Sequence, residues 1–136
     1  MRATGTFRVV SFVPVEVTPP PLAVATGLPV GLSTMEKQYE GEVAGRSATL
    51  FTAAFDQEQG LGTYVAMESF DGSLNEIAGT FNFAHSATTH GSDRAAEHFT
   101  IVPGSGTGGL AGIAGGGRIS IDGEGRHQIW FDYDLG

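Results

Sequence analysis

The sequence predicts an all-β fold, a single antiparallel barrel of eight strands spanning residues 1–136. Apolar and polar residues alternate with a period of two along nearly every segment, and glycine-containing turns interrupt this pattern about every ten residues. No window of about a dozen residues has the spacing of an amphipathic helix. Closure removes the exposed edges of an open sheet, so we favour an up-and-down barrel over the alternative, a two-sheet sandwich.

The composition limits the classes of function. The chain has no cysteine, which excludes disulfides, thiolate metal sites and a cysteine nucleophile. Its formal net charge of −8 argues against nucleic-acid and anionic-membrane partners. The N-terminus has no apolar signal core, and no apolar run approaches the ~20 residues of a membrane span. We therefore expect a soluble, cytoplasmic protein.

The alternation and the turn residues set the expected elements in order. The first strand follows the initial methionine, and the second follows a proline-rich segment. Later boundaries fall at Gly45-Arg46, Gln57–Gly60, Asp71–Ala78, Thr89–Asp93, a glycine-rich block and Asp122–Gly125. The predicted strands cover 3–12, 34–44, 47–56, 62–71, 79–87, 95–102, 117–122 and 127–134.

The segment Pro14–Leu32 departs from this pattern, because it holds five of the six prolines and Glu16 as its only charge. Proline cannot donate to a central ladder, so we expect a long loop. Its apolar side chains must cover something apolar. Two interpretations remain open: a plug that closes one barrel end, or a lid over a ligand cavity.

Residues Gly104–Gly117 include eight glycines in fourteen positions. Gly104, Gly106 and Gly109 match a dinucleotide fingerprint, but a phosphate-binding loop must open a helix. Each further glycine in a helix costs ~1 kcal/mol. We therefore predict a tight connection between two strands and no nucleotide binding.

Alternation also assigns the inward side chains. Small inward residues face aromatic ones, which favours a central cavity that holds one small ligand. The fourth strand is ambiguous, and we take its aromatic side as inward. The expected ligand-contacting residues are Tyr39, Phe51, Tyr64, Phe81, Phe83, Phe99, Phe131 and Tyr133.

The strongest polar signal is an expected cross-strand pair inside the barrel. If the 79–87 and 95–102 strands turn about Gly91, His85 opposes Glu97, with Glu68 on the neighbouring strand. A carboxylate beside an imidazole can orient and charge it for proton transfer, so His85, Glu97 and Glu68 are the candidate catalytic residues. A purely structural polar pair is the alternative. The four histidines do not suggest a convergent metal site, and Ser105 lacks a nucleophile elbow.

Several motifs resemble a known family: Gly79–Ser86, Val102–Thr107, Leu110–Gly115 and Asp132–Leu135, with Glu68. They resemble an uncharacterised bacterial domain-of-unknown-function family of small β-barrels similar to allene oxide cyclase. The resemblance implies a barrel with a central cavity and, by analogy with cyclases of polyketide pathways, an apolar substrate and no cofactor. Relatives usually carry a polar segment where this chain has Pro14–Leu32.

The expected function is a cofactor-independent cyclase or isomerase that folds an apolar, polyketide-like molecule inside the barrel. The alternative is a lipocalin-like, non-catalytic carrier of a hydrophobic molecule. A third interpretation is a filled barrel with a structural role. The outward Trp130, Val10 and Phe12 side chains favour association of the chain with itself.

Overall fold

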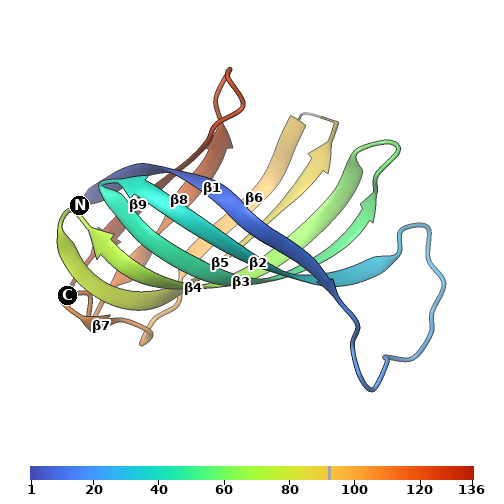
Figure 1. The fold of residues 1–136 in the computed structure, drawn as a ribbon, viewed down its shortest axis with the longest axis horizontal. Helices are drawn as coiled ribbons and strands as arrows, with labels where there is room; N and C mark the ends of the chain where they lie inside the picture. The colour runs from blue at the N-terminus through green and yellow to red at the C-terminus, as the bar shows by residue number, and fades with distance from the viewer. Residues whose placement is uncertain (92) are drawn as a thin grey trace.

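A computed structural model describes residues 1–91 and 93–136, and all its regular elements are β-strands. Figure 1 shows the strands curling around one interior, with the two termini at the same end. The elements are β1 (Arg2–Val15), β2 (Val30–Gly41), β3 (Val43–Asp56), β4 (Leu61–Leu74), β5 (Ile77–His90), β6 (Asp93–Ile101), β7 (Thr107–Gly108), β8 (Ala114–Ile121) and β9 (His127–Asp134).

The strands form one continuous antiparallel sheet in the order β6-β5-β4-β3-β2-β1-β9-β8, and the two-residue β7 pairs with β5. The terminal strands β6 and β8 lie side by side, but no ladder joins them in the described residues. The eight long strands therefore make a nearly closed barrel with one seam (Figure 1). The predicted barrel is confirmed, and no separate second sheet forms among the described residues.

Most strands are longer than the sequence predicted, and the β2–β3 turn lies elsewhere. The β2–β3 turn centres on Glu42, next to Gly41 at φ +115°, and the expected turn residue Gly45 lies inside β3. The β4–β5 turn is formed by Asn75 and Glu76, both with positive φ, as a tight hairpin requires. At Gly45 the glycine therefore marks an irregular backbone within a strand rather than the end of a strand.

The proline-rich segment is neither wholly loop nor a plug. Pro14 and Val15 pair with Ser33 and Leu32, so they extend β1. Proline is tolerated there because β9 pairs only with the first part of β1, which leaves this end as an edge. Between β1 and β2 the chain runs away from the barrel (Figure 1), and Leu22 is 89% exposed. A plug in this segment is wrong for this structure, whereas a lid stays a prediction.

The glycine-rich segment closes the end of the barrel that holds the termini. Leu110 and Ile113 are fully buried between successive turns, and no helix forms. Close packing requires the glycines: a Cβ on Gly106 would lie 2.1 Å from the Leu110 carbonyl oxygen, and one on Gly79 would lie 2.2 Å from the Thr107 carbonyl oxygen. The block is a strand connection, as predicted, and it also supplies the apolar plug.

The aromatic core fills the barrel above this plug. Phe81 on β5 and Phe131 on β9 meet edge to face with ring centroids 5.3 Å apart, and Phe83 contacts the same Phe131 ring at 5.1 Å. These three rings are almost completely buried. The central cavity expected at the aromatic wall is therefore wrong for this half of the interior, because the rings pack against one another.

We predict that Leu110→Ala lowers the free energy of unfolding by about 2–5 kcal/mol, since it empties space at the closed end. The matched control is Leu22→Ala in the exposed loop, which should change stability by less than about 0.5 kcal/mol. Urea unfolding followed by circular dichroism measures both. Equal effects of the two substitutions would contradict the assignment of the plug.

Candidate functional site

A fully buried carboxylate lies directly above the aromatic core. Glu68 on β4 accepts hydrogen bonds at Oε1 from the Tyr39 hydroxyl (2.6 Å) and the Ser47 hydroxyl (2.8 Å). Its Oε2 accepts from Lys37 Nζ (2.7 Å) and from His85 Nε2 (2.5 Å). Three strands, β2, β3 and β5, thus direct polar side chains at one carboxylate on β4.

The charges in this network balance. Burial alone would raise the pKa of Glu68, but the hydrogen bond from His85 and the charge of Lys37 outweigh it and lower the pKa to about 2. Burial lowers the pKa of His85, opposed by its bond to Glu68 and assisted by the charges of Lys37 and Arg94. At neutral pH the site therefore holds an ionised Glu68, the Lys37 ammonium and a neutral imidazole.

The neutral imidazole has a defined tautomer. Since Glu68 is ionised, Nε2 of His85 must carry the proton, and Nδ1 is left as an acceptor. The Tyr64 hydroxyl lies 2.8 Å from Nδ1 and donates to it, and Arg94 donates to the Tyr64 oxygen in turn. The structure thus contains a continuous hydrogen-bonded chain: Arg94, Tyr64, His85, Glu68.

The expected pairing of His85 with Glu97 is wrong. In the β5–β6 ladder His85 faces Phe99 and Phe83 faces Ile101, two residues away from the predicted register. A β-bulge follows, and Ala96 within it has φ +52°. Beside the turn His90 pairs with Asp93, which is already one residue from the predicted register, and the bulge in β6 adds the second residue. Of the two candidate carboxylates, Glu68 holds His85.

Glu97 instead forms ion pairs with Arg94 on its own strand and with Arg118 across the seam. Its Oε1 lies 2.8 Å from Arg94 Nε and its Oε2 lies 3.0 Å from Arg118 Nε on β8. Together with His85 and Phe99 these side chains line a pocket of about 380 Å³, here called the seam pocket. His85 is therefore reached from the seam.

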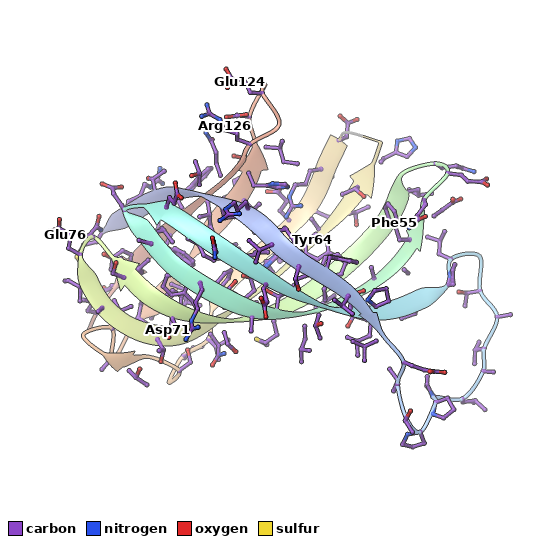
Figure 2. All side chains as sticks on the ribbon, viewed as in Figure 1. Phe55, Tyr64, Asp71, Glu76, Glu124 and Arg126 are labelled. Atoms are coloured by element: carbon purple, nitrogen blue, oxygen red, sulfur yellow. The ribbon has the colours of Figure 1, made fainter. Side chains whose placement is uncertain are left out.

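A second and larger pocket occupies the open end of the barrel. This mouth pocket has a volume of about 700 Å³, and its wall is mostly apolar. Phe51 and Tyr64 stack in that wall with centroids 4.9 Å apart. Figure 2 shows Phe55 and Tyr64 toward this end, away from Asp71 and Glu76. The other lining residues include Phe12, Pro14, Pro29, Val30, Ser33, Ala53 and Thr89.

The expected ligand-contacting residues separate into groups. Phe51 and Tyr64 line the mouth pocket, and Phe99 lines the seam pocket. Tyr39 is part of the Glu68 network rather than a pocket wall. The inward side of β4, ambiguous in the sequence, is the aromatic side. Residues without a place in either pocket belong to the packed core: Phe81, Phe83, Phe131 and Tyr133.

Phe12 was predicted to point outward, but it lies against Phe51 in the mouth pocket. The β1–β2 register shifts between Val9 and Ser11, which reverses the alternation beyond this point. Sequence reasoning also missed Lys37, Ser47 and Arg94. The signal was present for Lys37, which shares the inward parity of Tyr39 on β2.

In the described part of the chain, no three His, Asp or Glu side chains are placed to hold one metal ion. Over residues 1–91 and 93–136 the chain also has no helix long and apolar enough to cross a membrane.

Comparison with known proteins agrees with the fold. Residues 3–133 match the profile of a family described as "Protein of unknown function (DUF3224)". The chain belongs to this family. Its fold matches the crystal structure of a DUF3224 protein of unknown function from Shewanella oneidensis MR-1. The TM-score is 0.82 at 29% identity, over 100% of this chain and 98% of that one. No curated protein matches the sequence.

Family membership confirms the expected uncharacterised family of small barrels, but neither match carries a named activity. The similarity to allene oxide cyclase is not shown by these matches. The function of this DUF3224 protein therefore has to be argued from its own site.

The lowered pKa of Glu68 predicts that the folded protein loses stability in acid. A carboxyl that ionises more readily when folded stabilises the protein above its unfolded pKa, here 4.5, and loses that contribution as the pH falls to about 2. The contribution corresponds to about 3 kcal/mol. In Glu68→Gln this part of the pH dependence should vanish, so its stability curve should converge on the wild-type curve between these pH values.

The matched control is Glu58→Gln at an exposed turn, which should follow the wild-type curve in parallel. Because Glu68→Gln leaves the buried Lys37 without its counter-charge, a second variant replaces both partners, Lys37→Met with Glu68→Leu. Urea unfolding from pH 7 to pH 2 measures each protein. A wild-type curve that stays parallel to both Glu68 variants would contradict the charge assignment.

Proposed function

We propose that this DUF3224 protein is a cofactor-independent isomerase or cyclase that acts on an apolar carbonyl compound bound in the mouth pocket. One observation supports this most directly. The Glu68–His85–Tyr64 chain connects a buried carboxylate to a phenol hydroxyl in the wall of an apolar pocket. A polar network with a purely structural role has no need of a ligand-sized pocket at its end, so the mouth pocket beside Tyr64 supports a functional role.

The hydrogen-bonded chain of Tyr64, His85 and Glu68 is suited to taking one proton from a bound substrate and returning it. Neutral His85 accepts the Tyr64 proton at Nδ1 while the Tyr64 oxygen removes a proton from a carbon beside the substrate carbonyl. Ionised Glu68 stabilises the imidazolium that forms, and Arg94 stabilises the enolate oxygen. Return of the proton to another carbon regenerates Tyr64 and His85. The step is redox-neutral and consumes no co-reactant.

The mouth pocket would make the second contribution to the reaction by fixing the conformation of the bound substrate. Its wall is formed by rigid rings and strand residues, which favours holding a flexible, polyketide-like chain in a folded, reactive shape. Resemblance to barrels of the allene oxide cyclase type supports the same reaction class, although only by analogy of fold.

A non-catalytic carrier is the second candidate, and the lining of the mouth pocket favours it. Phe12, Phe51 and Phe55 need no chemistry to bind a hydrophobic molecule. A carrier would use the Glu68 network only to hold the barrel together. Turnover, not binding, distinguishes the two candidates.

We predict that the protein binds Nile red, a neutral apolar dye, and that Phe51→Ala weakens this binding about tenfold by removing ring contact. It should also catalyse deuterium incorporation from D₂O into members of a panel of apolar β,γ-unsaturated ketones, followed by proton NMR. Tyr64→Phe should keep dye binding and reduce exchange by roughly 10²–10⁴.

Tyr133→Phe in the closed half is the matched control and should leave the exchange rate unchanged. Dye binding without exchange by the wild-type protein would favour the carrier. Exchange that survives Tyr64→Phe would contradict the proton-transfer chain. Absence of dye binding would contradict both functions.

The apolar loop between β1 and β2 provides a separate prediction. Pro14 and Pro29, at its two ends, line the mouth pocket, so the loop is attached at the rim and can act as a lid. Deletion of residues 18–26 should weaken Nile red binding severalfold and leave the β-type circular dichroism unchanged, because all of those residues are exposed. Loss of the fold would show a structural role.

A further inference from the structure

The seam pocket has a positive balance of charge in an otherwise acidic protein. Two arginines, Arg94 and Arg118, face one carboxylate, Glu97, while His85 is neutral. The whole chain has only seven Lys and Arg residues and a net charge of −8. Two guanidinium groups in one pocket therefore give it a local positive charge, unlike the net negative charge of the protein, and favour an anion there.

Glu97 itself shows how this pocket holds a carboxylate. Its two oxygens each meet a different guanidinium, at 2.8 Å on Arg94 and 3.0 Å on Arg118. Both contacts are ion pairs through Nε, and Arg94 Nε has no aligned hydrogen-bond acceptor. Within the described residues Arg118 makes only this ion pair with Glu97, so its terminal N–H groups remain for a second acceptor.

Backbone geometry brings Glu97 to this position. Ala96 at φ +52° lies in the left-handed region, which residues with a side chain rarely adopt. The resulting bulge in β6 turns Glu97 toward Arg118 on β8, across a seam without a ladder in the described chain. Strained residues of this kind often lie at ligand sites.

Arg94 also connects the two pockets. It lines the seam pocket and donates to the hydroxyl of Tyr64, whose ring lies in the wall of the mouth pocket. The boundary between the pockets is thus a contact between two side chains.

We propose that the ligand of this barrel is an organic carboxylate, with its apolar body in the mouth pocket and its carboxylate between Arg94 and Arg118. The inference rests on the proposed function and adds the substrate class to it. A planar guanidinium matches a carboxylate with two parallel hydrogen bonds. The surplus of a single positive charge fits a monoanion and gives less support to a phosphate dianion.

The test compares two probes that differ in the headgroup alone, octanoate and octan-1-ol, as competitors of Nile red at pH 7.5 and low ionic strength. Wild-type protein should bind octanoate about fivefold more tightly than the alcohol. Arg118→Gln should remove most of that preference and leave octan-1-ol binding unchanged. Glu97→Gln removes the competing carboxylate and should strengthen octanoate binding about fivefold.

Arg46→Gln is the matched control, because Arg46 is an exposed arginine in one ion pair with Asp71 on the outer surface. It should leave both probes unchanged. Equal affinities for the two probes, or equal effects of the Arg118 and Arg46 substitutions, would overturn the carboxylate inference while apolar binding stands. If neither probe displaces Nile red, the proposed function fails as well. A Glu97→Gln variant that binds octanoate more weakly would show that Glu97 only fastens the seam.

Discussion

Glu68 separates the interior of the barrel into two halves of opposite character. A carboxylate without solvent costs several kcal/mol unless its charge and lone pairs are matched, and here Lys37, His85 and two hydroxyls match them. The partners come from β2, β3 and β5, so the carboxylate on β4 fixes the relative placement of these four strands. The side chains below it can then pack as an apolar core. The side chains above Glu68 line the mouth pocket and the seam pocket. Space is left there because the hydrogen-bond partners of Glu68 already cover its charge.

The loops at the two ends of the barrel differ in how closely they pack against the strands, and the backbone explains the difference. At the closed end the glycine-rich connection approaches neighbouring strands so closely that a Cβ on Gly106 or Gly79 would overlap a carbonyl oxygen. Such packing brings Leu110 into the core. At the open end the proline-rich loop cannot add to the sheet, and Leu22 and Val24 stay exposed. The interior is therefore reached from the mouth and from the seam, where the polar chain lies.

Most of the fold could be predicted from the sequence, because period-two alternation is a local signal that each strand carries. It placed Glu68, His85 and Phe83 inside correctly. The errors arose where the pairing between strands shifts. The bulge in β1 moved Phe12 from the outer face to the mouth pocket. In the β5–β6 hairpin the pairing beside the turn and the bulge in β6 each shift the register by one residue, which separates His85 from Glu97. A bulge depends on pairing with a distant strand, and nothing in the alternation of a single strand reveals it.

The same bulges give the site its chemistry. Beside the turn Thr88 pairs with Ala95, and this register continued without the bulge would place Glu97 opposite Ser86, on the face of β5 that points away from His85. The bulge instead shifts the pairing by one residue, so that Phe99 faces His85 and Glu97 reaches Arg94 and Arg118. His85 then has Glu68 on one ring nitrogen and the Tyr64 hydroxyl on the other. Among the described residues no ladder joins β6 and β8, and this seam leaves the space in which Glu97 reaches Arg118, since a complete ladder would hold both strands in regular register.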